Sequence, residues 1–107
     1  MIYKFRSKSA GDLIMLRLSG DQMLRVIGKV PATKGIIEPA AMPAAIRAIE
    51  EAIAQDEAQR RKADAQAVAE GRTPSRADGV TLRQRTWPFL DMLKRAKGGD
   101  VEIVWGV

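Results

Sequence analysis

Apolar and charged residues alternate at both ends of the chain, which is the pattern of half-buried β-strands. Near the N-terminus, Tyr3 and Phe5 alternate with Lys4 and Arg6, so one side of an extended strand would be apolar and the other cationic. Near the C-terminus, the same period places four apolar side chains on one side, namely Val101, Ile103, Trp105 and Val107. Both ends are therefore predicted to be strands that pair in one sheet.

The middle of the chain has the period of an amphipathic helix. A narrow apolar stripe at helical spacing is formed by Met42, Ile46, Ile49 and Ile53. The helix is expected to begin near Met42-Pro43, because proline is well tolerated in the first turn of a helix.

Beyond Gln55 the stripe ends, although helix formers continue to residue 70. Oppositely charged residues four apart recur here, such as Asp56 with Arg60 and Glu57 with Arg61, and each pair stabilises a helix by only ~0.2–0.5 kcal/mol. We therefore expect a solvated, fraying helical extension. A flexible loop rich in turn residues follows at 71–79, so that extension and loop together occupy the region near 57–80.

A third helix is predicted from Leu82 to Lys97. Thr81 and Gln84 have the spacing of a capping box, and one helical face is formed by Leu82, Phe89, Leu93 and Ala96. Pro88 lies inside this segment, where proline costs roughly 3 kcal/mol or kinks the helix. The alternative is a restart with Thr86 as the N-cap and Pro88 in the first turn.

Trp87 projects well away from the apolar face of this helix, between charged residues. One interpretation is that Pro88 rephases the helix, so that Trp87 packs under the loop at 71–80 or onto the sheet. The other is that Trp87 is a contact anchor, because tryptophan and arginine are enriched at interface hot spots. The candidate interaction patch consists of Arg83, Trp87, Leu90 and Lys94.

Short apolar runs leave the remaining elements less certain. Residues 13–18 suit a strand or a buried helical turn equally. Asp21 has the chemistry to cap a short helix that ends before Gly28. A short strand at 35–38 is expected to stop at Pro39.

The predicted fold is α+β, a small sheet of about three strands covered on one face by about three helices. The strands are expected near 2–6, 35–38 and 101–106, and the helices near 21–27, 42–56 and 82–97. With 107 residues, the chain should form a single domain over 1–107.

The amino-acid composition excludes most kinds of catalytic and metal-binding site. The chain has no cysteine and no histidine, so disulfides, thiolate metal sites and the commonest general base are all missing. Adjacent carboxylates such as Glu50 and Glu51 diverge by about 100° on a helix. We therefore predict no catalytic residues, no metal, no cofactor and no enzymatic activity.

The net charge of +5 permits only a weak case for nucleic-acid binding. Residues 1–30 carry six Lys or Arg against two Asp, and residues 31–56 reverse the sign, whereas a nucleic-acid binder usually concentrates its charge. Any such binding should be weak and independent of sequence. No apolar stretch approaches the ~20 residues of a membrane span, and no signal peptide is recognisable, so a cytoplasmic protein without membrane attachment is expected.

Short segments along nearly the whole chain resemble a small proteobacterial family known only as a domain of unknown function. They are residues 3–8, 12–15, 27–29, 42–46, 82–88 and 104–106. Leu82 to Pro88 is the most specific of these, and 55–79 matches poorly. The resemblance implies a bacterial intracellular protein and supplies no activity or site residues. Some relatives carry Phe-Gly where this chain has Leu16-Arg17, so no role is transferred to that turn.

These observations predict a non-catalytic protein-interaction module that binds a protein partner or a second copy through the surface around Trp87. The alternative is a nucleic-acid-binding accessory protein of low affinity. Salt dependence separates the two, because phosphate binding weakens steeply with salt.

Overall fold

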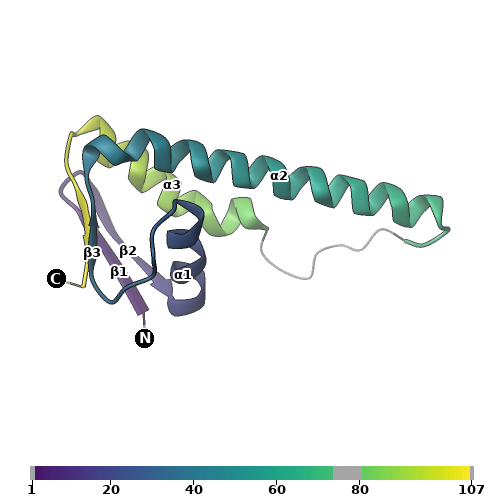
Figure 1. Cartoon of the computed structure of the whole chain (residues 1–107), viewed down its shortest axis with the longest axis horizontal. Coiled ribbons are helices and arrows are strands. Elements are labelled where there is room, and N and C mark those ends of the chain that lie inside the picture. The colour runs from purple at the N-terminus through teal and green to yellow at the C-terminus, as the bar shows by residue number, and fades with distance from the viewer. Residues whose placement is uncertain (1, 74–80, 107) are drawn as a thin grey trace.

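The computed structural model describes residues 2–73 and 81–106 (Figure 1). In chain order its elements are β1 (Ile2–Ser7), β2 (Ala10–Leu16), α1 (Arg17–Val26), β3 (Gly35–Ile37), the 3-10 turn η1 (Pro39–Ala41), α2 (Met42–Ala69), α3 (Leu82–Gly98) and β4 (Ile103–Trp105). The helices lie against one face of the sheet (Figure 1). This arrangement confirms the predicted α+β class.

The sheet is antiparallel, with the strand order β2-β1-β4-β3. Phe5 of β1 pairs with Trp105 of β4, which confirms that the two alternating ends of the chain are neighbours. The order places strands from the two ends at its centre, and leaves β2 and β3 at the edges. β2 is a strand in addition to the three predicted ones.

The segment that suited a strand or a helix is divided between the two. β2 continues through Leu16 and α1 begins at Arg17. The prediction that Asp21 caps a helix at 21–27 is wrong, because Asp21 lies inside α1. Its carboxylate accepts a hydrogen bond from the Tyr3 hydroxyl and lies 3.7 Å from Arg17 Nε. Burial, with this carboxylate, raises the pKa of Tyr3 above its ordinary value.

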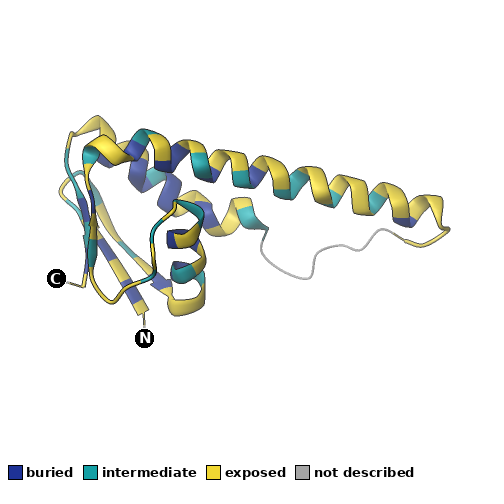
Figure 2. Cartoon of the chain, in the orientation of Figure 1, coloured by how far each residue is buried: buried dark blue, intermediate teal, exposed yellow. Residues whose placement is uncertain are grey.

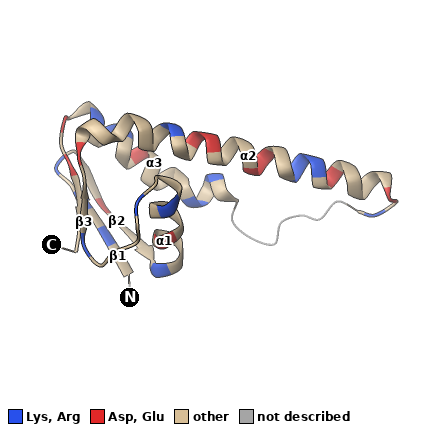
Figure 3. Ribbon diagram, viewed as in Figure 1, with Lys and Arg blue, Asp and Glu red and all other residues tan. Residues whose placement is uncertain are grey.

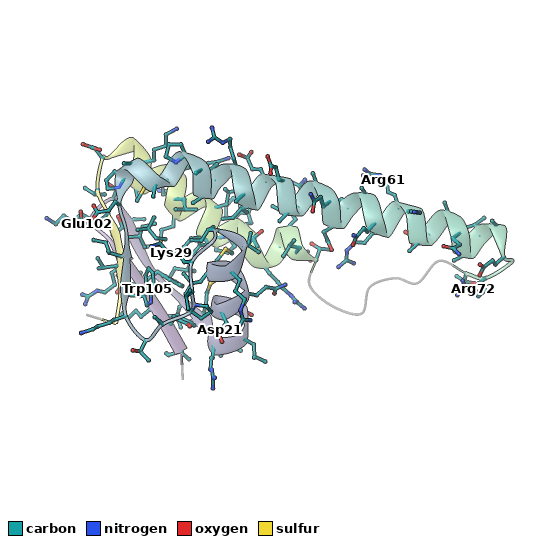
Figure 4. All side chains as sticks on the ribbon, in the orientation of Figure 1. Asp21, Lys29, Arg61, Arg72, Glu102 and Trp105 are labelled. Atoms are coloured by element: carbon teal, nitrogen blue, oxygen red, sulfur yellow. The ribbon has the colours of Figure 1, made fainter. Side chains whose placement is uncertain are left out.

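The core lies between the sheet and the helices. Eight of the apolar residues that periodicity placed on the strand and helix faces are buried, namely Phe5, Ile46, Ile49, Ile53, Phe89, Leu93, Ile103 and Trp105, whereas Leu82 and Val101 are only partly buried. Phe5 is at the centre, with ring centroids 4.8 Å from Phe89 and 5.5 Å from Trp105. Trp105, which Figure 4 labels, donates its indole N–H to the Ala32 carbonyl oxygen at 3.0 Å. Its ring covers Gly35 so closely that a Cβ there would overlap it.

α2 begins at Met42, as predicted, and its 28 residues correspond to about 42 Å. Its first half packs on the body, whereas Ala67 is the sole buried residue after Ile53 in this helix (Figure 2). The helix ends in a Schellman arrangement, in which Gly71 has a φ of 75° and Arg72 N–H donates to the Ala67 carbonyl oxygen at 2.7 Å. The helical extension is therefore present to Ala69. Most of the predicted flexible loop lies outside the described residues, and fraying stays a prediction.

α3 is one continuous helix that contains Pro88. The capping box between Thr81 and Gln84 is confirmed. The alternative of a restart at Thr86 is wrong, because Thr86 is an interior residue whose hydroxyl donates to the Leu82 carbonyl oxygen at 2.8 Å. Because Pro88 has no N–H, the carbonyl oxygen four positions earlier in α3 lacks its helical hydrogen-bond donor.

Candidate interaction surface around Trp87

The four residues of the predicted patch lie together in the structure. Steps of four, three and four residues along α3 place Arg83, Trp87, Leu90 and Lys94 on one stripe of the helix. All four line a groove between α3 and α2. We call it the Trp87 groove, and its α2 side is formed by Glu50, Ile53, Ala54 and Glu57.

Trp87 is the exposed aromatic residue of this chain. Its exposed fraction is 59%, whereas each of the other four aromatic residues is at most 3% exposed. The interpretation that Pro88 turns Trp87 inward onto the sheet is therefore wrong. Most of the loop at 71–80, under which Trp87 was otherwise expected to pack, lies outside the described residues. The helix continues through the proline without a restart, so the stripe keeps the phase of a regular helix and Trp87 stays on the outer side.

The floor of the groove is apolar. Leu90 and Ile53 are both largely buried, and Ala54 lies beside them. An apolar floor with an exposed indole on one wall would allow a partner side chain to contact carbon atoms on both sides.

The rim of the groove carries both signs of charge. Arg83 reaches across to Glu57, with donor–acceptor distances of 3.2 Å from Nε and 2.8 Å from Nη2. These hydrogen bonds lower the pKa of Glu57 below its ordinary value. They also raise the pKa of Arg83 above its ordinary value. Glu50 and Lys94 extend the rim, and Lys94 has no ion-pair partner within residues 2–73 and 81–106.

Sequence reasoning missed the half of the groove that comes from α2. Glu57 was paired with Arg61 on its own helix, whereas its carboxylate bonds Arg83, 26 positions away. The neighbouring pair was predicted correctly, since Arg60 Nε lies 2.9 Å from Asp56 Oδ2. The available signal was that Glu57 falls one helical turn beyond Ile53, close to the apolar stripe.

A second hollow adjoins Trp87 on the side of β2. It is lined by Ala10, Gly11, Asp12 and Leu13 from β2 and by Trp87, Pro88, Asp91, Met92 and Arg95 from α3. Arg95 Nε lies 2.8 Å from Asp91 Oδ2. Trp87 is therefore accessible from two sides.

Charges elsewhere are interspersed rather than gathered. Figure 3 shows acidic and basic positions following one another along α2. In the part of the chain that the structure describes, no three Asp or Glu side chains converge as metal ligands would. No helix among the described residues is long and apolar enough to cross a membrane.

The fold and the groove define a small α+β protein whose helices cover one face of an antiparallel sheet and leave one aromatic side chain exposed between two of them. A family model for the domain of unknown function DUF1840 matches residues 1–105. The chain belongs to this family, which confirms the resemblance seen in the sequence. Among curated proteins no match is found. Comparison with solved structures also gives no match.

Proposed function

We propose that this protein is a non-catalytic interaction module that binds a protein partner through the Trp87 groove. The observation that carries the proposal is the 59% exposure of Trp87 beside a buried apolar floor. Indole side chains are enriched among residues that dominate binding energy, and such residues lie centrally in an interface with a polar rim.

The charges of the rim favour a polypeptide over a nucleic acid as the partner. Arg83 is held by Glu57 across the groove, and Glu50 lies on the same wall as Glu57. A phosphate backbone would meet these carboxylates, whereas nucleic-acid sites concentrate positive charge. A segment with an apolar anchor and charges of both signs is complementary to this rim.

A pull-down with the Trp87→Ala variant tests the proposal. The bait should be the full chain, in bacterial lysate, with and without nuclease, and captured proteins should then be titrated individually. Trp87→Ala should weaken binding of a true partner at least fivefold, which corresponds to about 1 kcal/mol. Val68→Ala is the matched control, because Val68 is 61% exposed on the far part of α2.

Two outcomes would contradict the proposal. Equal binding by wild type, Trp87→Ala and Val68→Ala would mean that the groove is not the site. Capture that disappears with nuclease, or that weakens steeply as salt is raised, would support the nucleic-acid alternative.

A further inference from the structure

The face of the sheet opposite the helices is uncovered over the described residues (Figures 1 and 2). We call it the outer sheet face. Alternating burial in the strands assigns to it Ile2, Lys4 and Arg6 from β1, Asp12, Ile14 and Leu16 from β2, Ile36 from β3 and Val104 from β4.

One part of the outer sheet face is apolar. Ile2 pairs with Leu16 across the two strands, and Ile14 is the next residue on the same side of β2. Their exposed fractions are 55%, 71% and 59%. Among the described residues, three of the eight exposed large hydrophobic side chains form this cluster, and a fourth, Ile36, lies on the same face at the opposite edge strand. Such clustering marks interaction sites, whereas scattered exposed apolar residues do not.

The other part of the face carries charges of both signs. Lys4 Nζ lies 3.5 Å and Arg6 Nε 3.9 Å from the Asp12 carboxylate. Glu102, labelled in Figure 4, lines the same hollow as Arg6 and Asp12. Cations and carboxylates therefore alternate over this part of the surface.

We infer that the outer sheet face binds a second copy of this chain. A two-fold interface uses the same patch on both subunits, so the patch must complement itself. The outer sheet face meets this condition, because apolar side chains can face apolar side chains and Lys4 and Arg6 can face the other copy's carboxylates. A nucleic acid would meet Asp12 and Glu102, which disfavours it as the occupant. Stacked sheets lie about 10 Å apart, and the dimer would have helices on its two outer surfaces.

The size of the face sets the expected affinity. Four strands ~4.8 Å apart, with up to seven residues at ~3.3 Å each, give a face about 20 Å across. A face of this size has a footprint of about 400 Å², roughly half of the ~800 Å² per partner of a standard interface, which is the range of weak contacts. The dimer should therefore be in concentration-dependent exchange with the monomer.

Analytical ultracentrifugation of the full chain, from about 1 μM to 1 mM to bracket weak affinities, tests this inference. Wild type should show a monomer–dimer equilibrium, and Ile14→Lys should weaken it at least tenfold. Val68→Lys is the matched control and should leave it unchanged. Circular dichroism should show that Ile14→Lys remains folded, since Ile14 is exposed. A monomer at every concentration, or a dimer that Ile14→Lys and Leu16→Lys leave unchanged, would overturn the inference.

Cross-linking gives a second readout that does not require a change of affinity. The chain has no cysteine, so Ile14→Cys introduces a single thiol on the outer sheet face and Val68→Cys one on the far part of α2. A short bis-maleimide should join two copies of Ile14→Cys and few of Val68→Cys, and equal yields would count against the inference.

The Trp87→Ala variant separates this inference from the proposed function. Its dimerisation should match wild type, because Trp87 lies in the groove on the helical side. Dimerisation that is lost in Trp87→Ala and kept in Ile14→Lys would place self-association in the groove. That result would overturn the present inference while leaving the proposed function standing.

Discussion

Two aromatic residues that are two positions apart on α3 have opposite environments. Trp87 is 59% exposed, and Phe89 is fully buried against Phe5. Two helical steps rotate a side chain by about 200°, so one residue faces the groove and the other the core. The opposite positions explain why one is proposed to bind a partner and the other to hold the fold.

This difference predicts opposite effects of two truncations. Phe89→Ala should lower the free energy of unfolding by about 3–5 kcal/mol, the cost of a large cavity in a core. Trp87→Ala should lower it much less, because most of the ring is already in water. Urea denaturation of both variants measures this, and a comparable loss in the two would place Trp87 in the core.

At the scale of elements, α3 accommodates a proline that a helix interior normally excludes. Thr86 and Leu82 are joined by a side-chain hydrogen bond just before Pro88. Pro88 itself is exposed, so its ring fills no core space that another residue would leave empty.

Replacing this proline should stabilise the protein. Pro88→Ala restores an N–H that can donate to the Gln84 carbonyl oxygen, and it should raise the free energy of unfolding by up to about 3 kcal/mol. Pro43→Ala is the matched control, because Pro43 lies in the first turn of α2, where an N–H has no helical partner, and little gain is expected. Thermal unfolding distinguishes the two. Destabilisation by Pro88→Ala would indicate a packing role for its ring.

The stability that the fold gains from the ion pair between Glu57 of α2 and Arg83 of α3 should depend on pH. A carboxylate whose pKa is lowered on folding stabilises the fold above its unfolded pKa, ordinarily 4.5, and this stabilisation disappears as the pH falls through the folded value. Glu57→Gln should therefore be less stable than wild type at pH 7 and equally stable once Glu57 of wild type is protonated.

Denaturant unfolding at pH 7 and near pH 3 checks this expectation. Glu51→Gln is the control, because Glu51 is exposed on α2 and outside the lining of the groove. An equal loss for both substitutions, or a difference that persists in acid, would contradict the role given to Glu57.

Local sequence patterns predicted the elements themselves better than they predicted the contacts between elements. Thr81 and Gln84 are three residues apart, so the capping box could be read directly from the sequence. Asp21 was mistaken for an N-cap, because its actual hydrogen-bond partner, Tyr3, is 18 positions away and cannot be found from the local sequence. Periodicity likewise predicted the α3 half of the Trp87 groove. Glu57 lies in the groove because α2 packs beside α3, and local sequence patterns do not show which helices pack together.

At the scale of the whole molecule, α2 extends beyond the body that its first half helps to form (Figure 1). Its residues from 42 to 53 include five buried side chains, whereas the stretch from 57 to 69 includes only Ala67. Few buried apolar contacts mean that local opening of the second part exposes little new surface. The two halves of one helix should therefore differ in stability.

Hydrogen exchange measures this difference directly. Backbone amides of residues 57–69 should exchange much faster than those of residues 45–53, and limited proteolysis should cut the former stretch first. Slow exchange across the whole helix would indicate that another surface covers its second half. Repeating the measurement at high and low protein concentration would show whether that surface belongs to a second copy.

The two tryptophans lie in such different environments that their intrinsic fluorescence can report on folding and binding separately. Trp105 is buried with its indole N–H bonded to Ala32, whereas Trp87 lies in water at the groove. Their fluorescence should therefore respond to different events, Trp105 to unfolding and Trp87 to occupation of the groove. In a Trp87→Phe variant the remaining emission follows folding alone, and its subtraction from the wild-type signal would isolate binding without any attached label.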